Sequence, residues 1–285
     1  MKNLFTFIAA IFFAVTALAQ PVLFDATWDD KADPIRKPAT MPAELKPILW
    51  GQYAVHSHGT EKTNETIIRD FARACRDGRD GWGVWGGTKD LKPGVLVCLD
   101  FEVELTIGML THADCAKLFA AFHDESPGIR LTTYMGLPGI STIQEYAPGA
   151  SNLAPETRAR IVAAKKDWGP IVAQLDIIGA SSYIIDDRDI EVSLTYIRNA
   201  PPVWHRYYPG KPVHAWVTGE ITPFHGAGTK IDDATLERYI DALYAGKYEG
   251  VVVWGRYSQC DRLIDKLVKR QRPSIRPPVR SPMTP

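Results

Sequence analysis

Apolar and polar positions change their spacing repeatedly between about residues 47 and 271. Short runs rich in β-branched and aromatic residues alternate with longer segments whose apolar residues recur every three or four positions. These are the spacings of strands and of amphipathic helices. An alternation of strand and helix is typical of a parallel sheet. Because six or seven units follow one another, we predict an α/β fold, a (β/α) TIM-type barrel of seven or eight strands, regular or distorted.

The expected elements follow from this alternation. An open, doubly wound sheet is the rival architecture, but no glycine-rich phosphate loop follows the first predicted strand. Thr111, and one of Asp232 and Asp233, stand where N-cap side chains are expected. The predicted strands are 48–56, 81–85, 95–101, 129–136, 175–184, 212–217 and 250–254, and the predicted helices are 65–76, 112–123, 155–172, 190–197, 232–245 and 261–270.

The two ends of the chain differ from this central pattern. Residues 1–19 have a basic Lys2, an apolar stretch and an Ala-Leu-Ala site, the three parts of a secretory signal peptide cleaved after Ala19. An uncleaved anchor is the alternative. We therefore expect a secreted or periplasmic protein with an irregular arm over 20–46, a barrel domain over 47–271 and a disordered Pro/Arg-rich tail over 272–285.

Net charge bears on the binding partners of the chain, and its cysteines bear on disulfides and metal sites. The 33 basic and 33 acidic residues cancel, so nothing global favours nucleic acid or an anionic membrane. The four cysteines, at 75, 98, 115 and 260, permit up to two disulfides in three connectivities, and their spacing does not resemble a zinc site. Along its strand, Cys98 shares the inward face with Asp100, where a free thiol is as well placed as a bridge. We expect no cofactor, no metal and a monomer.

The run GVLVCLDFEVEL, residues 94–105, combines a buried-strand pattern with acidic residues at its end. Burying a carboxylate is costly unless something offsets it, so acids in this position point to chemistry. Side chains alternate along a strand, so Asp100 and Glu102 share one face while Leu99 and Phe101 share the other. Two close carboxylates do not ionise together easily, and the one in drier surroundings keeps its proton as a general acid.

Aromatic residues stand at the ends of the later predicted strands. These are Tyr134, Tyr183, Trp216 and Trp254. In a (β/α) barrel the catalytic groups gather at the carboxyl ends of the strands. Large aromatic rings beside two acids favour a sugar site, because ring faces stack on apolar sugar faces while polar groups bind the hydroxyls.

The same segments carry a family resemblance. GVLVCLDFEVEL, TTYMGLPG, LDIIGASSYI, PVHAW and GVVVWG, in this order, resemble the hyaluronidase family of glycoside hydrolases, family 56, over roughly residues 50–260. That family has a distorted (β/α) barrel and a D-x-E pair after an early strand. The resemblance implies a glycosidase in which the substrate's own 2-acetamido carbonyl attacks the anomeric carbon.

The resemblance also implies roles for individual residues. Glu102 is implied as the general acid and Asp100 as the residue that positions the acetamido group. Tyr183 matches a strand-end tyrosine of the family, and Trp254 matches the tryptophan that floors its sugar pocket. Tyr134 and Trp216 complete the expected substrate site.

Departures from the family pattern bear on the substrate. Trp216 replaces a tyrosine, and Val103 and Glu104 replace an aromatic residue and an arginine. An added acid without compensating positive charge repels a polyanion such as hyaluronan. A neutral or mixed glycan containing N-acetylhexosamine fits this charge better. Glu104 itself reads as a solvated loop acid.

Other interpretations of the same residues remain open. The acids and aromatics also suit a structural ion-pair network, or a catalytically silent carbohydrate-binding barrel. His56 and His58 have the His-x-His spacing of metal-dependent amidohydrolase barrels, although the later strands, with His214, supply no convincing further ligands. In a double-displacement glycosidase Glu220 would be the nucleophile, with its carboxyl group about 5 to 5.5 Å from that of the acid.

Overall fold

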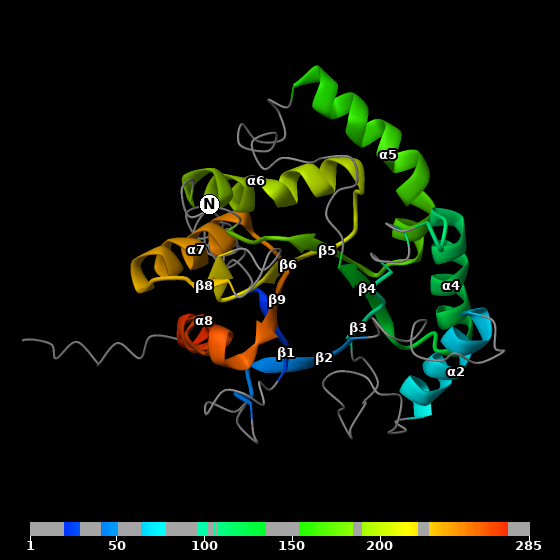
Figure 1. Cartoon of the computed structure of the whole chain (residues 1–285), viewed down its shortest axis with the longest axis horizontal. Helices are drawn as coiled ribbons and strands as arrows, with labels where there is room; N and C mark the ends of the chain where they lie inside the picture. The colour runs from blue at the N-terminus through cyan, green and yellow to red at the C-terminus, as the bar shows by residue number, and fades with distance from the viewer. Residues whose placement is uncertain are drawn as a thin grey trace, which may run out of the picture.

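Seven parallel strands form a closed barrel in the order β1-β2-β3-β4-β5-β6-β9 (Figure 1). The computed structural model describes residues 20–28, 41–50, 64–77, 96–101, 105, 108–134, 154–184, 190–221 and 228–272. Helices surround the ring of strands in this part of the chain. The predicted α/β barrel is confirmed.

The element bounds match most of the predicted segments to within a few residues. The barrel strands are β1 Val22–Trp28, β2 Leu45–Trp50, β3 Leu96–Cys98, β4 Arg130–Tyr134, β5 Ile177–Ser181, β6 Val213–Val217 and β9 Gly250–Arg256, and β7 Glu220–Ile221 pairs antiparallel with β8 Thr229–Lys230. The helices are α2 Asn64–Asp77, α4 His112–Glu125, α5 Pro155–Gln174, α6 Ile190–Tyr207, α7 Asp233–Gly246 and α8 Tyr257–Gln271.

The barrel begins earlier in the chain than the sequence predicts. Val22–Trp28 is strand β1, within the stretch that we predicted as an irregular arm, so that prediction was wrong for these residues. The strand pairs with β9 from Val22↔Gly250 to Trp28↔Arg256, and with β2 at Leu23↔Leu45. The alternating run VLFDATW is short and lies among Pro-rich and charged residues, so its partners far along the chain were not evident locally.

Helix α6 continues ten residues past its predicted end at Ile197. Pro201 and Pro202 lie inside it, where proline removes a helical hydrogen bond and normally ends the helix. The buried side chains of Ala200, Val203 and Trp204 follow the same packed face and stabilise the added turns. The predicted strand at 81–85, the leader 1–19 and residues 273–285 of the predicted tail lie outside the described residues.

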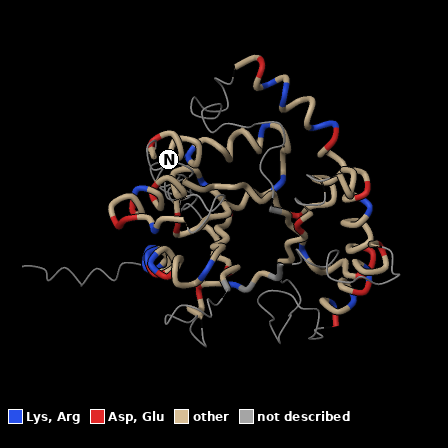
Figure 2. The backbone as a smooth tube through the Cα atoms, in the orientation of Figure 1, with Lys and Arg blue, Asp and Glu red and all other residues tan. Residues whose placement is uncertain are grey.

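Alternate residues of each strand enter different hydrophobic clusters. On β3, Cys98 belongs to a cluster in the barrel interior, which includes Phe24, Ile48, Leu96, Ile177, Tyr183, Trp216 and Val252. Val97 belongs to a second cluster formed with α2, α4 and α5, and Val251 and Val253 of β9 pack with α6, α7 and α8. Charged residues lie mostly on the surrounding helices (Figure 2).

Two helices start with the predicted caps. Thr111 accepts a hydrogen bond from the backbone N–H of Asp114, and the Asp114 carboxylate accepts one from the backbone N–H of Thr111, a reciprocal capping box at the start of α4. Asp232 accepts a hydrogen bond from the backbone N–H of Thr235 at the start of α7. The two caps satisfy backbone donors that helices otherwise leave unpaired.

A histidine lies inside the barrel rather than at its surface. His214 of β6 is 4% exposed, and its ring stacks on Phe24 at a centroid distance of 5.2 Å. Gly250 leaves room for the ring, since a Cβ there would lie 2.7 Å from it. Burial, together with the charge of Arg130, lowers the pKa of His214 to about 3. The native barrel therefore holds this imidazole neutral.

We expect His214 to make the protein less stable in mild acid. An unfolded histidine takes up a proton below pH 6.5, while native His214 does not until about pH 3, so native stability falls as the pH drops below 6.5. At pH 5 this amounts to roughly 2 kcal/mol. Urea unfolding at pH 7.5 and pH 5 should show a larger loss for the wild type than for His214→Gln. Equal losses would contradict the prediction.

Candidate active site

Asp100 lies two residues after the end of β3, at the carboxyl end of the barrel, and is 2% exposed. The strand preceding it alternates as predicted, because Cys98 lines the barrel interior whereas Leu99 and Phe101 pack against the helices. The backbone N–H of Leu99 donates to the Thr132 carbonyl at 3.1 Å and extends the contact with β4 past the strand end. Glu102, the predicted acid, lies outside the described residues, as does Glu104.

Tyr183 and Trp254 lie together at the same end of the barrel. Tyr183 belongs to the interior cluster and Trp254 packs against it, with their ring centroids 6.1 Å apart. Tyr183 is 2% exposed, whereas Trp254 is partly exposed. Of these two rings, Trp254 therefore has surface left for a ligand.

Trp216 is completely buried in the interior cluster. Its indole lies over Gly179 of β5, where an added Cβ would stand 2.6 Å from Nε1 and 2.3 Å from the Thr133 carbonyl oxygen. The pairing Gly179↔His214 places this glycine beside β6, the strand that carries Trp216. Trp216 thus fills the barrel and supports the neighbouring rings rather than offering an open face.

A buried hydrogen-bond network holds the segment that carries Tyr183. The backbone N–H of Ser182 donates to the Trp216 carbonyl at 2.9 Å, and the Ser182 carbonyl accepts from the Tyr239 hydroxyl. The Ser182 hydroxyl lies 3.1 Å from the hydroxyl of Tyr248, which donates to the Ile197 carbonyl at 2.9 Å. Sequence reasoning missed this network, because its members are far apart in the chain and each looks like an ordinary core residue.

Other parts of the predicted site lie wholly or partly outside the described residues. Tyr134 ends β4 and pairs with Gly179 in the β4–β5 register, but its side chain lies outside the described part of the chain. The segments after β3, β4, β5 and β7 (102–104, 135–153, 185–189 and 222–227) lie largely outside it as well. Of the predicted site residues, the structure therefore describes the side chains of Asp100, Tyr183, Trp216 and Trp254.

Glu220, the alternative nucleophile, begins β7 just after β6. Its side chain is 6% exposed, and Oε1 has no hydrogen-bond partner among the described residues. Burial raises the pKa of Glu220, although the positive charges of Arg256 and Lys230 act in the opposite direction. A carboxyl group held in this way is uncommon unless it has a function.

The described residues form no metal centre and no disulfide. No group of three or more histidine, cysteine, aspartate or glutamate side chains gathers among them in a metal-binding arrangement. His56 and His58 lie outside them. All four cysteines are buried free thiols, and burial raises the pKa of Cys75 and of Cys260 to about 12. Such thiols stay protonated and unreactive.

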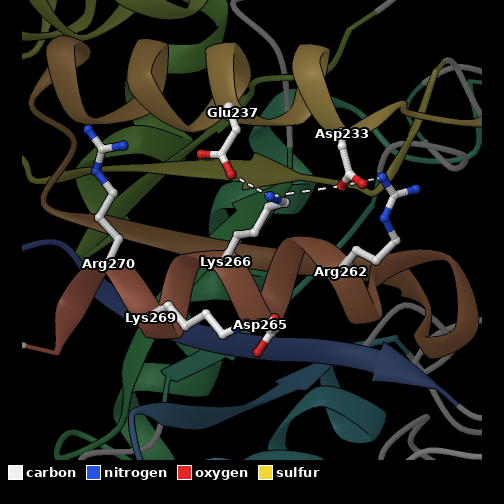
Figure 3. A pocket seen from close by; sticks show the side chains of 7 residues that line it. All are labelled: Asp233, Glu237, Arg262, Asp265, Lys266, Lys269 and Arg270. Carbon is white, nitrogen blue, oxygen red and sulfur yellow. Dashed lines mark hydrogen bonds and ion pairs between the residues drawn. The ribbon is translucent and has the colours of Figure 1, made fainter.

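A cavity of about 520 Å³ lies on the outer surface between α7 and α8 (Figure 3). Its lining is entirely charged, and each cation already has an anionic partner. Arg262 binds Asp233, and Lys266 lies between Asp233 and Glu237. Lys269 and Arg270 pair with Asp265 and Asp241. The charged residues around this cavity therefore form ion pairs, several of which join α7 to α8.

Comparisons with known proteins find only distant structural likenesses. No protein-family model and no curated protein matches the chain. Among solved structures, bee venom hyaluronidase is similar with 11% identity and a TM-score of 0.46, over 62% of this chain and 69% of that one. A β-glucanase from Saccharophagus degradans matches with 13% identity and a TM-score of 0.42, over 80% and 68% of the chains. These values are too low to assign a family.

A sugar isomerising enzyme is similar to a comparable degree. D-psicose 3-epimerase from Clostridium cellulolyticum has 15% identity and a TM-score of 0.39, over 75% of this chain and 64% of that one. The chain thus spans about two thirds of the length of these proteins. We infer no activity from these likenesses. None of the described helices is both long and apolar enough to cross a bilayer.

We expect Gly179→Ala to disrupt the packing of Trp216. The new methyl group would overlap the indole and the Thr133 carbonyl, so the variant should lose roughly 1–3 kcal/mol of unfolding free energy. Gly169→Ala on α5 is the matched control, because nothing lies within 4 Å of its added Cβ. The control should be as stable as the wild type or more stable, since alanine favours a helix over glycine. Urea unfolding and the near-UV circular dichroism of tryptophan measure both effects.

Proposed function

We propose that this protein is a secreted or periplasmic glycoside hydrolase that cleaves glycans containing N-acetylhexosamine. The observation that carries the proposal is Asp100, an acid with 2% exposure at the carboxyl end of a barrel strand. A (β/α) barrel places its reacting groups at this end. Tyr183 and Trp254 at the same end provide the aromatic surroundings of a sugar site.

In the proposed reaction, Glu102 donates a proton to the glycosidic oxygen as the bond to the anomeric carbon breaks. The acetamido carbonyl oxygen of the substrate attacks that carbon from the other side. Asp100 accepts a hydrogen bond from the acetamido N–H, and the Tyr183 hydroxyl donates one to the acetamido oxygen. Water then opens the cyclic intermediate, and Glu102 takes the proton from that water.

The binding roles divide according to exposure. Trp254, which is partly exposed, stacks on a sugar ring, and Tyr134 is the further residue that we propose for substrate binding. Trp216, which has no exposed surface, holds Tyr183 and Trp254 in place. The net charge of zero gives a polyanion no general attraction, so a neutral N-acetylated glycan is the preferred substrate.

We expect turnover to depend on the acetamido group and on the acid pair. The protein should release reducing ends from a tetramer of N-acetylglucosamine but not from the de-N-acetylated tetramer. Glu102→Gln should lower kcat by roughly 10²–10⁴-fold, because the leaving oxygen is no longer protonated. Asp100→Asn should lower kcat with little change in KM.

Each other outcome has a distinct meaning. Cleavage of both tetramers would contradict catalysis by the substrate's acetamido group. Binding without cleavage would identify a catalytically silent carbohydrate-binding barrel. Wild-type activity of Glu102→Gln would remove this residue from the reaction.

We expect Trp254→Ala to weaken both binding and turnover of the N-acetylglucosamine tetramer by roughly tenfold, because an aromatic stacking surface is lost. Trp168→Ala is the matched control. Trp168 is also partly buried, but it contacts His112 on the outer helices at a ring distance of 4.8 Å. Calorimetric Kd values and initial rates should change only for Trp254→Ala. An equal effect of both substitutions would indicate general destabilisation.

A further inference from the structure

Glu220 occupies a rigid position at the carboxyl end of β6. The chain turns there into the β7–β8 hairpin, in which Glu220 pairs with Lys230. Two glycines allow this close packing. A Cβ on Gly219 would lie 1.9 Å from the Gln259 carbonyl oxygen of α8, and one on Gly228 would lie 2.9 Å from the Glu220 Cβ. The Ile231 N–H also donates to the Gly219 carbonyl at 3.1 Å. The backbone of Glu220 is therefore held from both sides.

The side chain is buried without the contacts that usually accompany burial. Oε1 has no hydrogen-bond partner among the described residues, and leaving a buried acceptor unpaired is unfavourable. The neighbouring charged residues do not supply this hydrogen bond. Lys230 lies 3.5 Å from Asp261 of α8, and the positive charges of Arg256 of β9 and of Lys230 lower the pKa of Glu220 without giving its Oε1 a hydrogen bond. Among the described residues, the buried thiol of Cys260 also lies close enough to interact with Glu220 through its charge.

Glu220 and Asp100 lie at the same end of the barrel, after different strands. In the strand order, β4 and β5 separate β3 from β6, so the two buried acids follow strands on different walls of the barrel. Both follow the carboxyl ends of their strands, where parallel strands bring their reacting groups together. A substrate that contacts Asp100 on one wall has Glu220 on another.

We infer that Glu220 is a further residue of the substrate site, and that its carboxyl group forms a hydrogen bond with a hydroxyl or amide group of the bound glycan. This inference rests on the proposed function. It differs from a nucleophilic role, because a hydrogen-bonding carboxyl needs no attack on the anomeric carbon and is compatible with attack by the acetamido group.

The test compares Glu220→Gln with the wild type in stability and in binding. The amide keeps the shape of the side chain but removes its charge. Because burial raises the native pKa of Glu220, the wild type loses stability as the pH rises above 4.5. The variant should therefore have a Tm higher by roughly 2–4 °C at pH 7.5 and a smaller difference at pH 4.5. Its Kd for the N-acetylglucosamine tetramer should rise by roughly tenfold.

Glu237→Gln is the matched control, since it removes an exposed glutamate that pairs with Lys266 on the outer surface. It should leave the Kd unchanged and should not raise the Tm. A lower Tm for Glu220→Gln would show a structural ion pair and overturn the inference. A higher Tm with unchanged Kd would overturn it as well.

The two proposals fail in different ways. If the wild type binds no N-acetylated tetramer, the proposed function fails and the role of Glu220 in glycan binding fails with it. If the wild type binds the tetramer and Glu220→Gln binds it equally well, the inference about Glu220 alone fails.

Discussion

The pairing of β1 with β9 is the interaction on which this structure depends, because it converts a row of parallel strands into a closed barrel. Seven residue pairs join the first and last barrel strands, which are more than 200 residues apart in the chain. Helix α8 covers this seam. Gln271 donates a hydrogen bond to the Pro21 carbonyl, and Arg272 pairs with Glu44 at 2.9 Å. Closure also leaves the barrel without a free sheet edge.

A closed barrel has an interior that side chains must fill, and here that filling also shapes the site. Glycines at 179 and 250 leave space for the rings of Trp216 and His214, so large side chains on one strand lie over small ones on the next. The carboxyl end of the same interior contains Tyr183 and Trp254. The residues that we propose for substrate binding therefore also pack the interior, so substitutions there are expected to affect stability.

The site end of the barrel is organised by groups from several elements. Ser182 has contacts with β6 through Trp216, with α7 through Tyr239 and with the segment before β9 through Tyr248. These contacts define where Tyr183 stands. By contrast, Asp100 and Glu220 are acids in dry positions, and such groups are commonly retained for function rather than for stability. The charged side chains around the cavity between α7 and α8 differ from these acids, because each is paired with an opposite charge.

Local pattern was sufficient for much of the fold. The alternation of apolar runs and amphipathic segments predicted the barrel, most of its strands and helices, both N-caps and the inward face of Cys98, because periodicity and capping depend on residues close in the chain. Only the tertiary structure decided that Val22–Trp28 closes the barrel, that α6 continues past two prolines, that Trp216 is fully buried and that the thiols are free. Each of these depends on contacts with distant segments, which no local pattern contains.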